Sequence, residues 1–317
     1  MLRLVVARLT QTVLVLLLMS LVIYTLLAFM PGDPIDLMAS ADPNMSSTDV
    51  QRLKALHGLD KPMFERWYYW LQMVLSGDLG YSRLYASRVS EVLPTALMNT
   101  LQLLGLSLLL SLLIALPLGT LAALKPYSMR DYSINLVAFA GVSIPSFWLG
   151  LMLIIIFSVQ LGWLPAGGTG HAENASVWDH LRYLVLPVLT LTIASVSSHT
   201  RFVRGAMLEV LRQDFIRTAR AKGAGTRRIV LKHALRNALL PIVTILALDL
   251  GALFSGALVT ETVFAWPGMG KLIYDSIMGN DYNLALVALL LATLVTLAGN
   301  LLADIAYLWL DPRIRYH

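Results

Sequence analysis

The sequence predicts an all-α, polytopic membrane protein with six transmembrane helices, and three observations support this prediction. Apolar residues make up 57% of the 317 residues and charged residues only 14%, which is far from the balance of a soluble domain. Six apolar stretches are long enough to cross a hydrocarbon core of roughly 30 Å as helices. The basic residues gather in alternate connections, as expected of a chain that crosses a bilayer repeatedly.

The predicted spans divide the chain into short turns and two longer connections. The spans are residues 9–30, 96–124, 133–161, 183–203, 239–260 and 284–310, of which the fourth is the least apolar. The longer connections are the loop 31–95 and the charged segment 204–238. We expect residues 1–317 to form a single transmembrane domain.

The distribution of Lys and Arg predicts the orientation of the chain. Outside the loop 31–95, sixteen basic residues fall on one side of the predicted membrane, and only Arg182 and Lys271 fall on the other. Because basic loops stay inside, both termini and the segment 204–238 are expected in the cytoplasm. The net charge of +5 therefore needs no nucleic-acid partner to explain it.

Capping signals predict helices within both long connections. Ser46 and Asp49 form a capping-box pattern that begins a short helix ending near Gly58, and a second helix should run from Asp60, with Pro62 in its first turn, to Gly77. In the segment 204–238 we expect two helices, Met207–Lys222 and one from Thr226 toward Leu240. The residues Gly223, Ala224 and Gly225 would divide them, because glycine permits a sharp turn.

Motifs for energy conversion and catalysis are missing from the sequence. Near Gly268–Lys271 a phosphate-binding loop would require Gly and Ser or Thr where the chain has Ala265 and Leu272. There is no zinc-protease motif and no nucleophile turn, and no cysteine is available for thiolate chemistry. We therefore expect no enzyme activity, no metal site and no cofactor bound by this chain.

One segment resembles a known family. Residues 214–224 read D-F-I-R-T-A-R-A-K-G-A, and residues 236–241 read R-N-A-L-L-P. This resembles the EAA loop of ABC importer permeases, in which a short coupling helix docks in a groove of the ATPase. Arg217 replaces the acidic residue of the general motif and the Leu-Pro pair comes late, a form usual in the peptide and nickel branch. The residues that the resemblance assigns to ATPase coupling are Asp214, Arg217, Ala219, Arg220, Ala221, Lys222, Gly223 and Ala224.

Further motifs extend the resemblance over nearly the whole chain. They are P-G-D-P at 31–34, G-L-D-K-P at 58–62, G-D-L-G at 77–80, T-E-T-V-F at 260–264, W-P-G-M-G at 266–270 and D-P-R-I-R at 311–315. Together they resemble the first permease subunit of dipeptide, oligopeptide and nickel importers. The resemblance implies a type I ABC importer permease fold in the bacterial inner membrane, with the loop 31–95 in the periplasm.

The same resemblance implies a set of partners. These are a second, homologous permease that we expect to be a different chain, two ATP-binding subunits that bind ATP and Mg²⁺, a periplasmic solute-binding protein and the lipid bilayer. The expected substrate is a di- or oligopeptide; nickel, glutathione or a metal complex is the alternative. A self-sufficient carrier is disfavoured, because the spans hold few ionisable residues for ion coupling.

Candidate pathway residues come from polar side chains within the spans. Asp249 lies near the middle of the fifth span, where a charge is costly unless it faces a wet cavity or a partner group. It could receive the amine of a peptide or simply pair with a neighbouring helix. Ser143, Ser146 and Ser195 are weaker pathway candidates, because small hydroxylated residues commonly serve helix contacts in membranes.

A second candidate surface lies at the outer mouth, before the sixth span. Glu261, Trp266, Pro267 and Gly268 could face the solute-binding protein. A loop that packs over the pore is an equally good interpretation of these residues.

Overall fold

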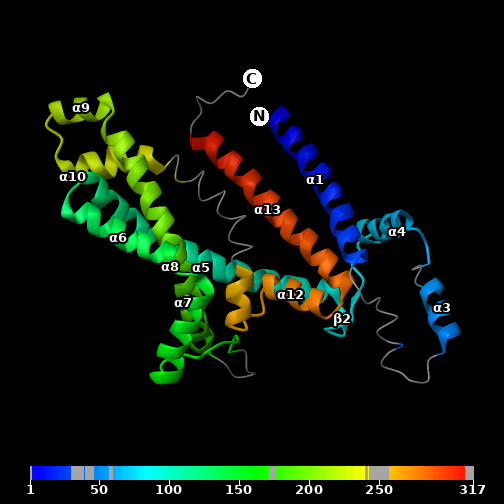
Figure 1. The fold of residues 1–317 in the computed structure, drawn as a ribbon. Helices are drawn as coiled ribbons and strands as arrows, with labels where there is room; N and C mark the ends of the chain where they lie inside the picture. Colours follow the sequence, from blue (N-terminus) through cyan, green and yellow to red (C-terminus); the bar gives the residue numbers. More distant parts are fainter. Residues whose placement is uncertain are drawn as a thin grey trace. The chain divides into compact units, whose positions relative to one another are not determined.

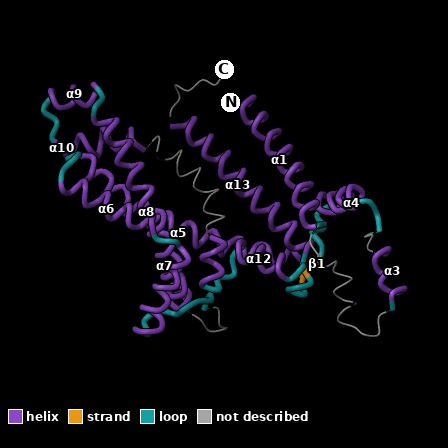
Figure 2. The backbone as a smooth tube through the Cα atoms, viewed as in Figure 1, coloured by secondary structure: helices purple, strands orange, loops and turns teal. Residues whose placement is uncertain are grey.

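The computed structural model describes residues 2–29, 39, 46–56, 60–170, 176–239, 242 and 257–310, with side chains described outside 2–7, 56 and 303–310. In this part of the chain nearly all regular structure is helical (Figures 1 and 2). Its contacts fall into two units, residues 1–98 with 268–297 and residues 99–267 with 298–317.

The first unit combines helices with one short hairpin. Its elements are α1 (Leu2–Ala28), α3 (Ser47–Leu56), α4 (Met63–Leu75), β1 (Tyr81–Ser82), β2 (Ser87–Arg88), the start of α5 (Val89–Leu124), α12 (Met269–Met278) and most of α13 (Tyr282–Leu310). The strands are antiparallel, with Tyr81 opposite Arg88. The core of the unit is an apolar cluster drawn from α1, α4, α5, α12 and α13.

The two helices predicted in the loop 31–95 are present, while the predicted end of the first near Gly58 lies outside the described residues. Asp49 N–H donates to Ser46 Oγ and Ser46 N–H donates to Asp49 Oδ2, both at 3.2 Å, which is the reciprocal capping box that begins α3. Hydrogen bonds from the Ser46 hydroxyl and backbone lower the pKa of the Asp49 carboxyl. In α4, Trp67 is buried, and its Nε1 donates to Ser20 Oγ of α1 at 3.1 Å.

Asp281 and Asn283 fasten the hairpin to the turn before α13. Asp281 Oδ2 accepts from Ser82 Oγ at 2.7 Å and from the backbone N–H of Leu84 at 3.0 Å. Asn283 Nδ2 donates to Leu79 O at 2.9 Å. Gly80 has a φ of +75° and lies directly against the Asn283 side chain, so a Cβ atom has no room there.

The second unit contains the helices that lead to the segment 204–238. Its elements are the rest of α5, α6 (Met129–Ser143), α7 (Ser146–Leu153), the π-helix η1 (Ile154–Gln160), α8 (Val177–Leu211), α9 (Asp214–Ala221), α10 (Thr226–Arg228) and the π-helix η2 (Ile229–Ala234). In Figure 1, α9 and α10 lie at one end of α8, in yellow-green. Helices α6 and α8 pack against each other.

Four predicted spans correspond to single helices that are long and apolar enough to cross a membrane. They are Arg8–Ala28, Val89–Leu124, Val177–Leu211 and Tyr282–Leu302. The fifth span, with Asp249, lies mostly outside the described residues. The third span is not one straight helix, contrary to prediction, because its halves Met129–Ser143 and Ser146–Gln160 are bent by 93°.

Proline explains the break in the third span. Ile144 is extended, with φ −89° and ψ 120°, as expected for a residue that precedes a proline. Pro145 then caps the start of α7. The proline fits there because the first residues of a helix need no N–H partner within it.

Candidate coupling site

The chain turns sharply between α8 and α9. We predicted one helix over Met207–Lys222, and this is wrong: α8 ends at Leu211 and α9 begins at Asp214. Gln213 between them is extended, with φ −71° and ψ 152°. Met207 and Ile216 are nine residues apart, so a continuous helix of 3.6 residues per turn would place them about 180° apart. The turn allows both side chains to enter one core.

Ile216 attaches α9 to the rest of the second unit. Its side chain is fully buried with Val203 and Met207 of α8 and with Ile229 and Val230 of η2. Ala123 at the end of α5 belongs to the same cluster. Ile216 therefore links α9 to an apolar cluster that η2, α8 and α5 share, and closely packed apolar side chains transmit a displacement to their neighbours.

Most of the predicted coupling residues lie on the exposed side of α9 or in the turn that follows. They are Asp214, Arg217, Arg220, Ala221, Lys222 and Gly223, while Ala219 and Ala224 are half-buried. Arg217 lies 3.4 Å from Asp214 in an exposed ion pair that contributes little stability. Phe215 adds an apolar ring, 43% exposed, to this basic surface. The side of α9 opposite Ile216 is thus a polar and basic surface with one aromatic side chain.

A Schellman motif ends α9. Gly223 has a φ of +80°, Ala224 N–H donates to Ala219 O at 3.1 Å, and Gly223 N–H donates to Arg220 O at 2.9 Å. The half-buried Ala219 and Ala224 both pack against the apolar cluster, which supplies the hydrophobic contact of the motif. The small-residue pattern thus has a structural reason: glycine takes the left-handed conformation, and alanines allow the turn to close tightly.

The return path begins as predicted at Thr226. Gly225 is extended, with φ −66° and ψ 156°, and caps α10. The helix continues through η2, whose wider turn is a rare form that often occurs at functional sites. Because η2 contributes Ile229, Val230 and Ala234 to the cluster, it packs with α9 and α8 in the same core.

The three candidate pathway serines lie on different helices or helix ends. Ser143 and Ser146 flank the break between α6 and α7, whereas Ser195 is half-buried in α8. Ser143 Oγ donates to Phe139 O within its own helix at 2.9 Å. A substrate contact by these serines stays a prediction, as does one by Asp249.

Three of the four residues expected at the outer mouth are buried inside the chain. Glu261 and Trp266 have no exposed surface, and Gly268 is also buried. Thr100 Oγ1 donates to Glu261 Oε1 at 2.5 Å, and Trp266 Nε1 donates to Asn99 O at 3.1 Å. Direct contact with a binding protein is therefore corrected for Glu261 and Trp266, because their side chains hold the loop to α5. Pro267 is exposed, and its contact with the solute-binding protein stays a prediction.

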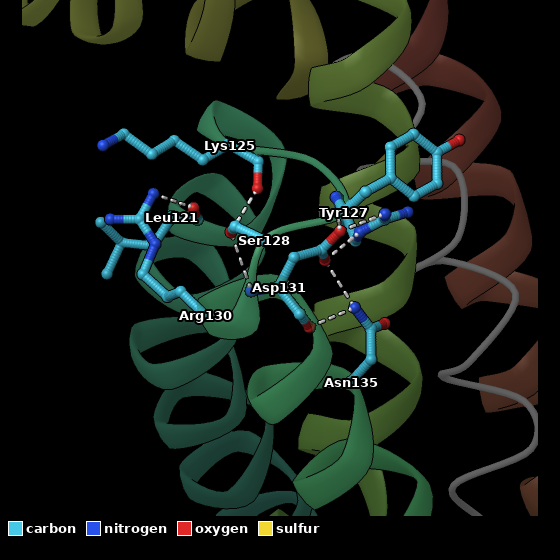
Figure 3. Close-up of polar contacts among 8 residues, drawn as sticks. Leu121, Lys125, Tyr127, Ser128, Arg130, Asp131 and Asn135 are labelled. Atoms are coloured by element: carbon cyan, nitrogen blue, oxygen red, sulfur yellow. Dashed lines mark hydrogen bonds and ion pairs between the residues drawn. The ribbon is translucent and has the colours of Figure 1, made fainter.

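One ion pair near the coupling site was not predicted from the sequence. Asp131 at the start of α6 and Arg204 in α8 form two hydrogen bonds of 2.6 Å, Nε to Oδ1 and Nη2 to Oδ2. Figure 3 shows Asp131 with its neighbours Tyr127, Ser128 and Asn135. Ser128 caps α6 by accepting from Asp131 N–H. The S-x-x-D pattern of residues 128–131 signals this cap, but nothing local in the sequence signals the pairing with Arg204, 73 residues later.

Metal binding has no support in the described part of the chain. There, no group of three or more His, Asp or Glu side chains is placed to hold an ion. The candidate site consists of α9, the Gly223 turn and the apolar cluster that Ile216 enters.

Comparison with known families gives this arrangement its context. Residues 115–316 match the family described as "Binding-protein-dependent transport system inner membrane component", and residues 1–86 match the N-terminal family of the same kind of component. The chain belongs to this family of inner-membrane permease components, with the fold of an ABC importer permease. It is a multi-pass membrane protein and a transport subunit that works with ATPase and binding-protein partners.

Full-length relatives show which branch of the family the chain is similar to. It is 40% identical to the oligopeptide transport system permease protein AppB of Bacillus subtilis, over 98% of this chain and 99% of the relative. It is 38% identical to the di/tripeptide permease DppB of Pseudomonas aeruginosa, over 94% of each, and 35% identical to the glutathione permease GsiC of Escherichia coli, over all of both.

A solved structure supports the fold. An inward-facing structure of the MetNI methionine ABC transporter matches with a TM-score of 0.58 and 21% identity, covering 70% of this chain and 97% of that one. A likeness at this level of identity concerns the fold alone.

Proposed function

We propose that this chain is the permease subunit of an ATP-driven importer of di- or oligopeptides, and that α9 is the helix through which a partner ATPase drives it. One observation carries the proposal. Helix α9 is held by a single large buried side chain, Ile216, while six of the eight residues of the family motif are exposed around it and only Ala219 and Ala224 pack against the cluster. A helix arranged in this way can dock on a partner and pass its displacement into α8, η2 and α5.

The proposed mechanism is alternating access. ATP binding would bring the two ATPase subunits together, move the coupling helices and open the two permeases outward, and hydrolysis would reset them. The basic residues Arg217, Arg220 and Lys222 would complement an acidic groove on the ATPase, and Phe215 would fill an apolar recess in it. ATP and Mg²⁺ belong to the partner subunits, and this chain performs no catalysis in the proposal.

The proposed assembly pairs this chain with a second, different permease. Both termini and the segment 204–238 would face the cytoplasm, as the distribution of Lys and Arg predicts. The solute-binding protein would dock on the opposite side, where Pro267 is an exposed candidate contact. A homodimer of this chain is the outcome that would correct this part of the proposal.

The peptide substrate is supported by the full-length relatives. Two of them are named for oligopeptides and for di- or tripeptides, and the third is named for glutathione, which is itself a tripeptide. Selection among these substrates can lie with the binding protein, so nickel and metal complexes remain outcomes of the test.

The test is uptake into proteoliposomes that contain the whole transporter, supplied with its binding protein and with ATP inside. Labelled dipeptide, tetrapeptide, glutathione and nickel should be compared at equal concentrations. ATP-dependent accumulation of a peptide supports the proposal, and accumulation of nickel alone would reassign the substrate. Uptake by this chain without any ATPase would show that it is a self-sufficient carrier.

A further inference from the structure

The ion pair between Asp131 and Arg204 occupies a position that the proposed mechanism has not used. The Asp131 side chain is 3% exposed and the Arg204 side chain 23%. Arg204 lies between Val203 and Met207, which are both in the cluster that receives Ile216 of α9. Asp131 lies in the first turn of α6, the first half of the broken span. The pair thus joins the base of the coupling site to the helix that leads to the break.

Asp131 is fixed from several directions. Arg204 Nε and Asn135 Nδ2 donate to Oδ1 at 2.6 and 2.7 Å, while Arg204 Nη2 and the Tyr127 N–H donate to Oδ2 at 2.6 and 2.9 Å (Figure 3). These four donors match the roughly four lone-pair sites of a carboxylate. The carboxylate therefore cannot rotate without breaking several hydrogen bonds at once.

The geometry of the pair fixes orientation as well as distance. Two parallel bonds from the planar guanidinium prevent α8 from rotating relative to α6, which a single point contact would allow. A second close approach lies toward the other end of α6, where a Cβ atom on Gly141 would collide with Ser197 of α8. With contacts near both ends of α6, the two helices form one rigid pair up to the break at Ile144.

We propose that Asp131 and Arg204 are positioning residues of the transport cycle, whose ion pair makes α6 and the end of α8 move as one body when α9 is displaced. The inference rests on the proposed role of α9 as the coupling helix. Motion imposed on Ile216 would pass to Val203 and Met207, then through Arg204 to Asp131, and then along α6 to the bend. Without the pair, α8 could move while α6 stayed behind.

The first test measures this rigidity directly in the whole transporter. The chain has no native cysteine, so Met129→Cys at the exposed start of α6 and Glu209→Cys on the exposed side of α8 add the only thiols of this chain, and any reactive cysteines of the partner subunits are replaced before labelling. Double electron–electron resonance should give the same distance between the labels in the nucleotide-free and the ATP-trapped states. Adding Asp131→Asn should make that distance depend on the nucleotide. A nucleotide-dependent distance in the unsubstituted pair would overturn the proposal.

The second test separates positioning from folding. Asp131→Asn replaces one carboxylate oxygen that accepts from Arg204 by an amide NH₂ group. Arg204→Lys keeps the positive charge but cannot form the two parallel hydrogen bonds of the guanidinium. In assembled transporters, uptake per ATP hydrolysed should fall by about tenfold or more in Asp131→Asn, because the half-buried Arg204 loses its carboxylate partner and no longer holds α6. The double variant with Asp131→Arg and Arg204→Asp exchanges the two charges, and it should recover part of the lost uptake per ATP hydrolysed. Unchanged uptake per ATP in Asp131→Asn would also overturn the proposal.

A matched control lies one turn away on α8. Arg201 is exposed, and its guanidinium lies 5.2 Å from the ring centroid of Phe139 on α6, so Arg201→Ala removes a neighbouring contact between the same helices. It should leave uptake per ATP unchanged, and a loss equal to that of Asp131→Asn would contradict a specific role for the pair. If α9 were not the coupling helix, variants in α9 would keep ATP-dependent uptake, an outcome distinct from failure of the pair.

Discussion

Replacing Gly223 by alanine should weaken coupling through the backbone alone. Gly223 has a φ of +80°, and a Cβ atom at this position would meet no other atom within 4 Å. The cost is therefore that of placing an L-residue in the left-handed region, roughly 1–2 kcal/mol. Such a cost changes the population of the closed Schellman turn by about 5- to 30-fold. We expect the Gly223→Ala transporter to retain less ATPase and to take up peptide more slowly.

The assay is pull-down of the ATPase by a tagged permease from solubilised membranes, together with peptide uptake by proteoliposomes. Gly223→Asn should lose less than Gly223→Ala, because asparagine tolerates the left-handed conformation, and Gly223→Val should lose more, because a β-branched residue tolerates it poorly. Gly225 is the matched control: it also has open space around it, but its φ is −66°. Equal losses for Gly223→Ala and Gly225→Ala would refute the reasoning from φ.

Three further substitutions test the packing around the coupling site, each read as a thermal midpoint of the purified transporter and as retained ATPase. Ile216→Ala should cost about 2–5 kcal/mol of local stability and release the ATPase, because the side chain is fully buried; retention of the ATPase would contradict its role as the attachment of α9. Gly119→Ala should lower the midpoint, because the new Cβ would lie 2.7 Å from Thr200 O and from Val203, and an unchanged midpoint would mean that α5 and α8 are not in such close contact. Gly205→Ala should leave retention intact and raise the midpoint slightly, because this position in α8 is open and alanine gains up to about 1 kcal/mol in a helix interior; a lower midpoint would indicate an undescribed contact.

Local signals in the sequence predicted the helix ends well. The capping box of Ser46 and Asp49 and the glycine turn at Gly223 depend on residues within a few positions, so the chain states them directly. The sharp turn at Gln213 could not be predicted in this way. It results from the need to bury Met207 and Ile216 in one core, and that core does not exist until η2 has packed against α8.

The contacts of the site residues could not be predicted where their partners lie far away in the sequence. Glu261 seemed suited to an exposed role because glutamate is rarely buried, yet its partner Thr100 lies 161 positions away in the chain. Asp131 and Arg204 are likewise joined only by the packing of α6 on α8. The residue types therefore predicted that these side chains need polar partners. Which partners they pair with, and whether the side chains are exposed to water, depends on the packing of the helices.

The break at Ile144 limits where lipid can lie against this chain. Helix α6 has 15 residues, as do α7 and η1 together, so each half is about 22 Å long, less than a hydrocarbon core of roughly 30 Å. Neither half can cross the bilayer alone, and at the 93° bend the extended backbone leaves polar groups outside any helix. Acyl chains cannot satisfy those groups, so irregular backbone at that depth has to face protein or water. We therefore expect the surface around the exposed Ser143 and the half-buried Ser146 to lie in a subunit contact or along an aqueous passage, with annular lipid stopping short of it.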